Sequence, residues 1–402
     1  MRPTVLGIHN YHYLRGGAER YFLELGALLA REGHRVVHLS TAHAANEPAP
    51  GPARFVAPIE LARPGPRDAL RFVYSRTAAN AVRALVKSEH PALAHLHIYH
   101  GQLGAPLLGA LAEAGVPAVQ TLHEYKLLCP VHTLLSNGVA CEACGGRRFW
   151  RALPRRCNRG SLARTLVNVG ESYVSRWLGA QSRIGHFIAV SEFVRAKMLA
   201  HGLAPERITT LHNFVDPAAH APASGPGAYA LYAGRLERLK GVFTLLEAAA
   251  EAPELPLWIA GDGEARPELE RALGNPRLAH VRLLGFLRGP ELARTIAGAR
   301  CVVVPSLWDE PFGLAALEGF AVARPVVASR AGGLAELVDD GADGFLVPPG
   351  DVAALAERLR WMSRHGAGAV ELGMRGRRKV EERFSPAVHY AGLARIYERV
   401  LA

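Results

Sequence analysis

The stretch TVLGIHNYHYLRGGAERYFLELGALLAREGHRVVHLS, residues 4–40, contains two different apolar periodicities. Its two ends, residues 4–9 and 34–40, are compact apolar runs that predict strands. Residues 18–33 have the amphipathic pattern of a helix that ends at Gly33. Strand, helix and strand in this order predict two parallel strands in a sheet whose faces are covered by helices.

The same alternation continues along the first half of the chain, where further strand-like runs occur at residues 93–98, 117–123 and 185–191. Residues 212–229 interrupt it, because this segment is rich in proline, glycine and alanine and has little periodicity. Such a composition is typical of a linker between domains. Beyond the linker the alternation of strands and helices starts again.

The chain of 402 residues is longer than one hydrophobic core usually supports. We therefore expect an α/β protein of two doubly wound Rossmann-like domains, residues 1–212 and 213–380. A final helix, residues 381–402, is expected to return to the N-terminal domain. The two domains should face each other across a cleft lined by the carboxyl ends of both sheets, where open α/β sheets bind ligands.

The composition is that of an ordinary globular protein, with 49% apolar and 21% charged residues. No apolar run approaches the roughly 20 residues that a membrane-spanning helix needs. The first apolar run is also too short for a secretory signal and instead predicts a buried strand. We expect a cytoplasmic protein.

The net charge of +11 is concentrated in one segment, which has seven arginines and no acidic residue between Cys144 and Glu171. The arginines are Arg147, Arg148, Arg151, Arg155, Arg156, Arg159 and Arg164. A basic patch of this kind predicts contact with phosphate, either in anionic lipid headgroups at the inner face of the membrane or in the diphosphate of an acceptor. A solvated arginine surface is the alternative. Nucleic acid is not expected as a partner, because the segment has no recognition motif for it.

Two basic residues follow the first strand of the second domain, in AGRLERLKG at residues 233–241. Arg235 and Lys240 would lie beside the start of a helix, whose amides and dipole favour anions, so the pair suits a diphosphate. The turn LLGFLRG, residues 283–289, could offer backbone donors and acceptors to the edge of a base, at Gly285, Phe286 and Leu287.

The segment WDEPFGLAALEGF, residues 308–320, places Glu310 in a loop and Glu318 in the following helix. Eight residues of full helix would separate them by roughly 12 Å, so they could bracket the two ends of an extended ligand. A carboxylate only accepts hydrogen bonds, and vicinal hydroxyls are its natural partners. Glu318 on a ribose and Glu310 on a sugar would span a nucleotide sugar, with backbone amides at the helix start facing the same ligand (Phe312, Gly313 and Leu314).

Three segments together resemble the retaining glycosyltransferases of family 4, which are two-domain GT-B enzymes that use nucleotide sugars. They are GRLERLKG (234–241), EPFGLAALE (310–318) and ARPVVASRAGGLAELV (323–338). The resemblance implies diphosphate contacts for Arg235 and Lys240. It also implies a ribose contact for Glu318 and a donor-sugar contact for Glu310. No catalytic metal is implied, and the absence of an Asp-x-Asp motif agrees.

Two features of the first domain fit the same family. Gly16 and Gly17 lie between the first strand and the first helix, where a backbone without side chains can approach a ligand. The resemblance makes this the loop that closes on the donor. His123 follows a strand, and the resemblance places it beside the reacting sugar. We assign it a positioning or transition-state role, because in retaining transfer the departing phosphate takes the acceptor's proton on the same face.

Four of the five cysteines lie in one basic insert, about residues 129–164: Cys129, Cys141, Cys144 and Cys157. Their spacing, C-x11-C-x2-C-x12-C, favours a tetrahedral structural zinc site in a reducing cytoplasm. Unliganded thiols and disulfides are the alternatives. The family core does not need this insert, which would present the arginines and shape the acceptor entrance.

The sequence therefore predicts a retaining glycosyltransferase that needs no cofactor for catalysis. It would move a sugar from a UDP- or GDP-sugar to a glycan or lipid-linked glycan in cell-surface polysaccharide synthesis. Its catalytic residues would be His123, Glu310, Arg235 and Lys240. Two alternatives share the architecture: a nucleotide-sugar epimerase and a noncatalytic nucleotide-sugar-binding protein.

Overall fold

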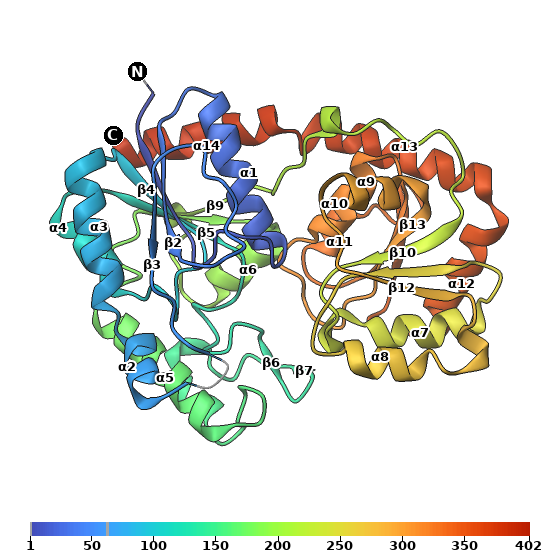
Figure 1. The fold of residues 1–402 in the computed structure, drawn as a ribbon, viewed down its shortest axis with the longest axis horizontal. Coiled ribbons are helices and arrows are strands. Elements are labelled where there is room, and N and C mark those ends of the chain that lie inside the picture. The colour runs from blue at the N-terminus through green and yellow to red at the C-terminus, as the bar shows by residue number, and fades with distance from the viewer. Residues whose placement is uncertain (1, 62–63) are drawn as a thin grey trace. The chain divides into compact units, whose positions relative to one another are not determined.

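A computed structural model describes residues 2–61 and 64–402. The chain divides into two units (Figure 1). Unit 1 runs to Leu211 and also includes Tyr390–Ala402, whereas unit 2 is the continuous segment His212–His389. The division after Leu211 coincides with the start of the linker predicted at residues 212–229.

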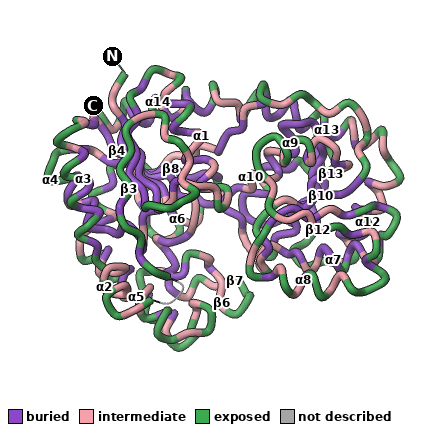
Figure 2. The backbone as a smooth tube through the Cα atoms, viewed as in Figure 1, coloured by how far each residue is buried: buried purple, intermediate pink, exposed green. Residues whose placement is uncertain are grey.

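The described part of unit 1 contains a seven-stranded sheet in the order β3-β2-β1-β4-β5-β8-β9, with every neighbouring pair parallel. The strands are β1 (Val5–Ile8), β2 (Val36–Thr41), β3 (Ala53–Val56), β4 (Leu93–Leu96), β5 (Ala118–Leu122), β8 (His186–Ala189) and β9 (Ile208–Thr210). The five inner strands are buried at every residue, as Figure 2 shows for the centre of this sheet. Only the edges reach solvent, which explains the continuous apolar runs in the sequence.

The helices of unit 1 are α1 (Gly17–Arg31), α2 (Pro66–Val73), α3 (Arg76–Glu89), α4 (Pro106–Glu113), α5 (Leu162–Trp177) and α6 (Glu192–Ala200). Helix α1 buries one face through Tyr21, Phe22 and Leu25. It stops two residues before Gly33, whose φ of +86° is a left-handed conformation that glycine adopts without strain. The insert adds a short hairpin and two 3₁₀ turns: β6 (Leu135–Ser136), β7 (Val139–Ala140), η1 (Gly145–Arg147) and η2 (Phe149–Ala152).

Unit 2 contains a six-stranded parallel sheet in the order β12-β11-β10-β13-β14-β15. Its strands are β10 (Tyr229–Ala233), β11 (Leu257–Ala260), β12 (Val281–Gly285), β13 (Ala299–Val304), β14 (Val326–Ser329) and β15 (Gly344–Val347). Its helices are α7 (Val242–Glu251), α8 (Arg266–Ala272), α9 (Gly289–Gly298), α10 (Leu314–Ala321), α11 (Leu334–Leu337), α12 (Val352–Arg364) and α13 (Gly366–Arg383). The predicted doubly wound α/β architecture is confirmed.

Both sheets place the first strand of their unit in the middle. β1 lies between β2 and β4, and β10 lies between β11 and β13. The chain therefore builds outward in both directions from the pairs β1/β4 and β10/β13. Such a topological switch point is where open α/β sheets hold their ligands, at the carboxyl ends of the two strands.

The C-terminal segment differs from the single closing helix that the sequence predicts. Helix α13 ends at Arg383, and α14 (Pro386–Leu401) starts after a bend at Phe384 and Ser385. Pro386 accounts for the break, because proline disfavours helical backbone at the preceding residue and fits the first position of a new helix. From Tyr390 onward α14 belongs to unit 1, where Tyr390 and Tyr397 share hydrogen bonds with His34 (3.0 Å) and His95 (2.7 Å).

No helix in the described ranges combines the length and the apolar character needed to cross a membrane.

Candidate functional site

Lys240 and Glu310 meet at the switch point of unit 2. Lys240 comes from the loop after β10 and Glu310 from the loop after β13, and these two strands are neighbours. The Lys240 Nζ atom lies 2.7 Å from Glu310 Oε1. The same carboxylate oxygen accepts a hydrogen bond from the Ser306 hydroxyl. The structure thus brings together two of the predicted catalytic residues across the two central loops.

The Glu310 side chain is 9% exposed. Burial raises the pKa of this carboxyl, but the Lys240 ammonium and the hydrogen bonds to Glu310 outweigh burial, so its net pKa is lowered. The Lys240 Nζ atom also lies 5.2 Å from the centre of the Trp308 ring. A carboxylate that stays ionised in a largely dry position is a strong and directional acceptor for hydroxyl groups.

Glycines fix the backbone around this pair. Gly241 has a φ of +72°, and a Cβ atom there would lie 1.7 Å from the Pro305 carbonyl oxygen, so only glycine lets the loops after β10 and β13 approach so closely. On the other side, the Gly333 amide donates to the Glu310 carbonyl at 2.7 Å. A Cβ atom on Gly332 would lie 2.3 Å from the same oxygen. The Glu310 backbone is therefore held by the turn after β14.

The other predicted donor residues of unit 2 are placed as follows. Arg235 is exposed and forms an ion pair with Glu237 at 2.7 Å, rather than with a carboxylate across the switch point. Glu318 lies half-buried on α10. Phe312, Gly313 and Leu314 lead into that helix, and Gly313 has a φ of +112°. Since the helix begins only at Leu314, the eight-residue helical separation assumed for the two glutamates does not apply.

The predicted base-binding turn lies at the end of β12, the strand at one edge of the sheet. The Gly285 carbonyl accepts a hydrogen bond from the Gly261 amide at 2.7 Å. Phe286 is an exposed aromatic side chain, and Leu287 is half-buried. The turns after β11 and β12 are therefore tied together at the same end of the sheet that carries Lys240.

The switch point of unit 1 carries Gly16 and Gly17. Gly17 is the first residue of α1, and Gly16 caps the helix with extended backbone (φ −177°). An extended φ is open to any residue, so the backbone conformation alone does not require glycine at position 16. The predicted reason, close approach of a ligand to a bare backbone, stays a prediction.

His123 directly follows β5 and shares a hydrogen bond with His97, which directly follows β4: the His123 Nε2 and His97 Nδ1 atoms are 3.1 Å apart. The His95, His97 and His123 rings stack in a row, with centroids 4.5 and 5.3 Å apart. His9, after β1, lies 6.1 Å from the His97 ring. A row of imidazoles thus lies at the carboxyl ends of β1, β4 and β5.

His9, His97 and His123 are neutral near pH 7. Burial, with a smaller contribution from neighbouring imidazoles, lowers the pKa of His9, His38 and His123 to about 3. Burial also lowers the pKa of His97 well below its ordinary value. A neutral imidazole can donate one hydrogen bond and accept another. His123 is therefore suited to orient a hydroxyl group rather than to neutralise a phosphate.

The four cysteines of the insert lie in one neighbourhood but are free thiols. Cys144 packs against Phe149, and Cys157 lies at the edge of the same small apolar cluster. Burial, with a smaller contribution from the other three cysteines, raises the pKa of the Cys144 thiol to about 12. In residues 2–61 and 64–402, no three His, Cys, Asp or Glu side chains are arranged to hold a metal ion. The structural zinc stays a prediction.

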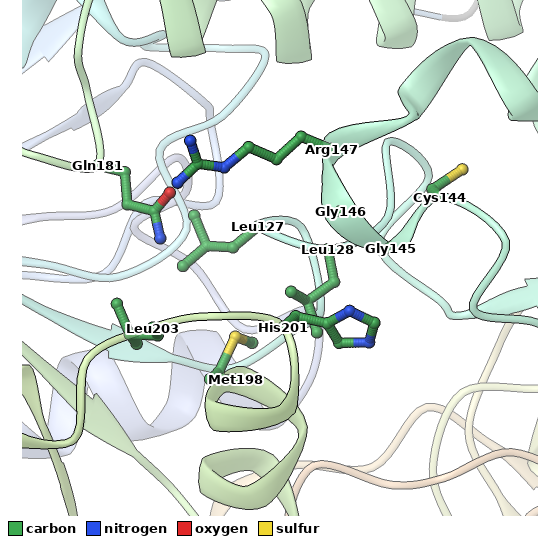
Figure 3. Close-up of a pocket in the computed structure, with 10 residues that line it drawn as sticks. All are labelled: Leu127, Leu128, Cys144, Gly145, Gly146, Arg147, Gln181, Met198, His201 and Leu203. Carbon is green, nitrogen blue, oxygen red and sulfur yellow. The ribbon is translucent and has the colours of Figure 1, made fainter.

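Figure 3 shows a small pocket where the insert meets α6, lined among others by Leu128, Arg147, Met198 and His201. His201 and Lys197 both form ion pairs with Glu142 of the insert, and His201 does so at 3.0 Å. The Cys144 sulfur points away from the other labelled side chains (Figure 3). We interpret this pocket as part of the interface through which the insert packs against α6.

Sequence reasoning missed several residues that support the site. Ser306 bonds to Glu310, His97 bonds to His123, and Gly332 and Gly333 hold the Glu310 backbone. The Gly-Gly pair shortly after a strand was a usable signal, because such a pair indicates close backbone approach. No local pattern distinguishes Ser306 or His97, whose importance depends on contacts between different strands.

Comparisons with known proteins identify the family of this chain. A family model described as Glycosyltransferase Family 4 matches residues 15–219, and one described as Glycosyl transferases group 1 matches residues 227–365. Glycogen synthase of Mycobacterium tuberculosis is 29% identical over 95% of this chain and 91% of its own length.

Two solved structures have the same fold. Sucrose-phosphate synthase of Thermosynechococcus elongatus has a TM-score of 0.76 at 22% identity, covering 99% of each chain. Anabaena HepE in complex with UDP-glucose has a TM-score of 0.71 at 18% identity, covering 99% of this chain and 100% of its own. Fold and family models together show that this chain belongs to Glycosyltransferase Family 4, with the GT-B architecture.

Proposed function

We propose that this glycosyltransferase moves a sugar from a UDP- or GDP-sugar to a glycan or lipid-linked glycan, in the cytoplasm, with retention of the anomeric configuration. The observation that carries the proposal is the Lys240–Glu310 pair at the switch point of unit 2. The pair places a cation beside an ionised carboxylate that accepts hydrogen bonds. An activated sugar would present phosphate oxygens to the cation and hydroxyls to the carboxylate.

The two groups would divide the work. Glu310 would accept hydrogen bonds from hydroxyls of the donor sugar, since its lowered pKa keeps it ionised. Lys240 would contact the diphosphate, and its charge would stabilise the negative charge that grows as the sugar departs. Arg235, which is exposed and paired only with its near neighbour Glu237, would turn to the same diphosphate.

The rest of the donor would extend along the carboxyl edge of the unit 2 sheet. We propose Glu318 for the ribose and the turn at residues 285–287 for the base. The amides of Phe312, Gly313 and Leu314 would face the phosphates, because the first turn of α10 leaves amides without helical partners. The similarity to HepE, whose structure was solved in complex with UDP-glucose, supports a nucleotide-sugar donor for this chain.

The chemical step then needs no resident metal. A bond forms between an acceptor hydroxyl oxygen and the anomeric carbon while the bond from that carbon to the diphosphate oxygen breaks. The hydroxyl proton passes to the departing phosphate oxygen on the same face, so the configuration is retained. His123 and the loop at Gly16 and Gly17 would orient the reacting sugar. We propose a role in cell-surface polysaccharide synthesis for the product.

A donor screen tests the proposal. Thermal shift is measured with UDP-, GDP- and ADP-sugars, and hits are incubated with and without glycan acceptors while NMR follows the anomeric proton. We expect one donor to stabilise the protein and to give an α-linked product from an α-linked donor. Inversion would contradict the proposed stereochemistry. Binding without hydrolysis or transfer would identify a binding protein, and epimerised donor without acceptor an epimerase.

A further inference from the structure

Helix α5 is amphipathic in the reverse sense: its inward face is polar and its outward face is apolar. Four of its five buried residues are polar, namely Thr165, Glu171, Ser172 and Ser175, and Val169 is the fifth. Its exposed residues include Arg164 and Arg176 and four large apolar side chains: Leu162, Leu166, Tyr173 and Trp177. At 3.6 residues per turn these four lie within an arc of about 60°. A helix that only covered the sheet would show the opposite pattern.

Ionic contacts explain how such a helix stays attached to unit 1. The Glu171 carboxylate is buried and lies 2.7 Å from Lys126 Nζ and 3.1 Å from His100 Nδ1. Lys126 also donates to the Pro130 carbonyl at 2.7 Å. The inward face is thus held by paired charges, which fixes α5 in place and leaves its apolar face outward.

Neighbouring elements extend the apolar face. Helices α2 and α5 pack against each other, and η2 packs against α5, where the Trp150 amide donates to the Tyr173 hydroxyl at 3.2 Å. Figure 1 shows α2 and α5 together at one end of unit 1. Leu70 is 72% exposed and Trp177 83% exposed. The combined surface, here called the α2–η2–α5 face, consists of Leu70, Tyr74, Trp150, Leu162, Leu166, Tyr173 and Trp177.

The α2–η2–α5 face gathers seven of the fifteen large apolar side chains exposed in the described ranges. Chance scatter over the surface does not give such a concentration, and contiguous exposed apolar patches mark interaction sites. Two of the seven are tryptophans and two are tyrosines, the residues that favour the boundary between a membrane and water.

The charge around this face selects the partner. Six of the seven arginines between Cys144 and Glu171 are exposed: Arg147, Arg148, Arg155, Arg156, Arg159 and Arg164. Arg67 on α2 and Arg176 on α5 are exposed as well. No acidic residue lies between residues 144 and 171, so the segment that carries η2 and leads into α5, here called the arginine rim, is strongly positive. An anionic lipid bilayer offers negative headgroups to the rim and an apolar layer to the centre.

We propose that the α2–η2–α5 face is a membrane-docking surface that inserts its aromatic and leucine side chains among the headgroups of an anionic bilayer. Docking combines two contributions. The arginine rim gives attraction that salt screens, and the apolar side chains give burial that salt does not weaken. This inference does not depend on the proposed transfer reaction, since it uses none of the residues assigned to the donor.

The test is co-sedimentation of the full chain with vesicles of equal parts phosphatidylglycerol and phosphatidylcholine, compared with pure phosphatidylcholine. We expect binding only to the anionic vesicles, with tryptophan emission shifted to the blue and quenched by brominated lipid. The double variant L166E/W177E should bind at least about tenfold more weakly, because two apolar contacts are replaced by charges that anionic lipid repels.

Matched controls separate docking from damage to the fold. Leu401→Glu changes an exposed helical leucine of unit 1 that is 41% exposed and outside the face, and it should leave vesicle binding unchanged. R156E/R164E should weaken binding and reduce its salt dependence, whereas R54E/R395E, also exposed and in unit 1, should not. Each variant is first checked by thermal melting.

Three outcomes would overturn the proposal: no binding to the anionic vesicles, equal loss of binding in the L401E and L166E/W177E variants, or binding without a shift or quenching of tryptophan emission. Polyuridylate is the comparison for nucleic acid. If it bound more tightly than the vesicles and the loss of arginines abolished that binding, the face would be a nucleic-acid surface instead. Unchanged vesicle binding by L166E/W177E would contradict the insertion of apolar side chains into the bilayer.

Discussion

The two units share a sheet topology but carry different side chains at the ends of their central strands. Each sheet has its first strand in the middle, and each therefore has a switch point at the carboxyl ends of its two central strands. Unit 2 fills that position with charge, in the Lys240–Glu310 pair. Unit 1 has a row of stacked imidazoles at the corresponding position, in which His97 and His123 are neutral near pH 7. One edge suits an anion and the other suits hydroxyl groups.

This difference teaches that topology sets where a ligand binds, whereas the loop side chains decide which ligand it is. Buried imidazoles with lowered pKa cannot neutralise a diphosphate, since they carry no charge near pH 7. A buried ion pair can exchange one partner for a phosphate oxygen or a hydroxyl. The experiments below test whether this division between the units holds.

The largest effect is expected from Glu310→Ala. Loss of the carboxylate removes the proposed acceptor for the donor sugar and leaves Lys240 without its 2.7 Å partner. The transfer rate should fall by about 100-fold or more, while circular dichroism shows a folded protein. The control is Glu371→Ala, which removes an exposed carboxylate from α13. A near-normal rate in the Glu310 variant would discard the charged site of unit 2.

The next largest effect should come from the two cations. Lys240→Ala and Arg235→Ala should each weaken binding of the nucleoside diphosphate product by about 10- to 100-fold, the usual loss for one charge-assisted hydrogen bond. Calorimetry measures it directly. Arg271→Ala, an exposed arginine on α8, is the matched control. If the control lost as much affinity, general surface charge rather than the switch point would hold the diphosphate.

A smaller effect is expected in unit 1. His97→Asn removes the hydrogen bond to His123, so we expect kcat to fall by about tenfold or less while the KM for the donor changes little. His123→Asn should reduce kcat further. His280→Asn in unit 2 is the control. A change confined to the donor KM would show that the imidazoles bind donor rather than orient the reaction.

The most gradual difference should appear as pH falls. The pKa of His9, His38 and His123 is lowered from 6.5 to about 3 in the folded chain, so the unfolded chain binds protons first. Their stabilising contribution is complete above pH 6.5 and is lost between pH 6.5 and 3, at about 1.4 kcal/mol per pH unit for each histidine.

Hydrogen exchange separates the two units in this experiment. Between pH 7 and pH 5, after correction for intrinsic exchange, peptides from β1 and β4 should lose more protection than peptides from β10 and β13. Unit 2 has a smaller source of the same effect in His389, whose pKa burial lowers to about 4. An equal loss of protection in both units would show that the buried imidazoles of unit 1 do not make it more sensitive to acid than unit 2.

Local patterns were sufficient for the fold. Every strand predicted from an apolar run is present, because buried parallel strands need continuous apolar residues. The short edge strands β3 and β9 were missed, since an exposed edge does not need such a run: three of the four residues of β3 are exposed. The residue types at the site were also predictable, as Arg235, Lys240 and Glu310 stand in recognisable motifs.

Pairing was not predictable. That Lys240 meets Glu310 depends on the order of β10 and β13 in the sheet, which no local pattern contains. The reversed polarity of α5 was hidden for the same reason. Its buried Glu171 is explained only by Lys126 and His100, which lie far away in sequence.

The division of the chain has a consequence for its synthesis. Unit 2 is one continuous segment, whereas unit 1 is completed only by Tyr390–Ala402. As the ribosome releases the chain, the whole of unit 2 emerges before Tyr390 and Tyr397 can reach His34 and His95. A nascent chain must therefore hold an incomplete unit 1, with two buried imidazoles lacking their tyrosine partners, until residues 390–402 are translated. Expression of residues 1–211 alone should yield an aggregation-prone fragment, whereas residues 212–389 alone should fold.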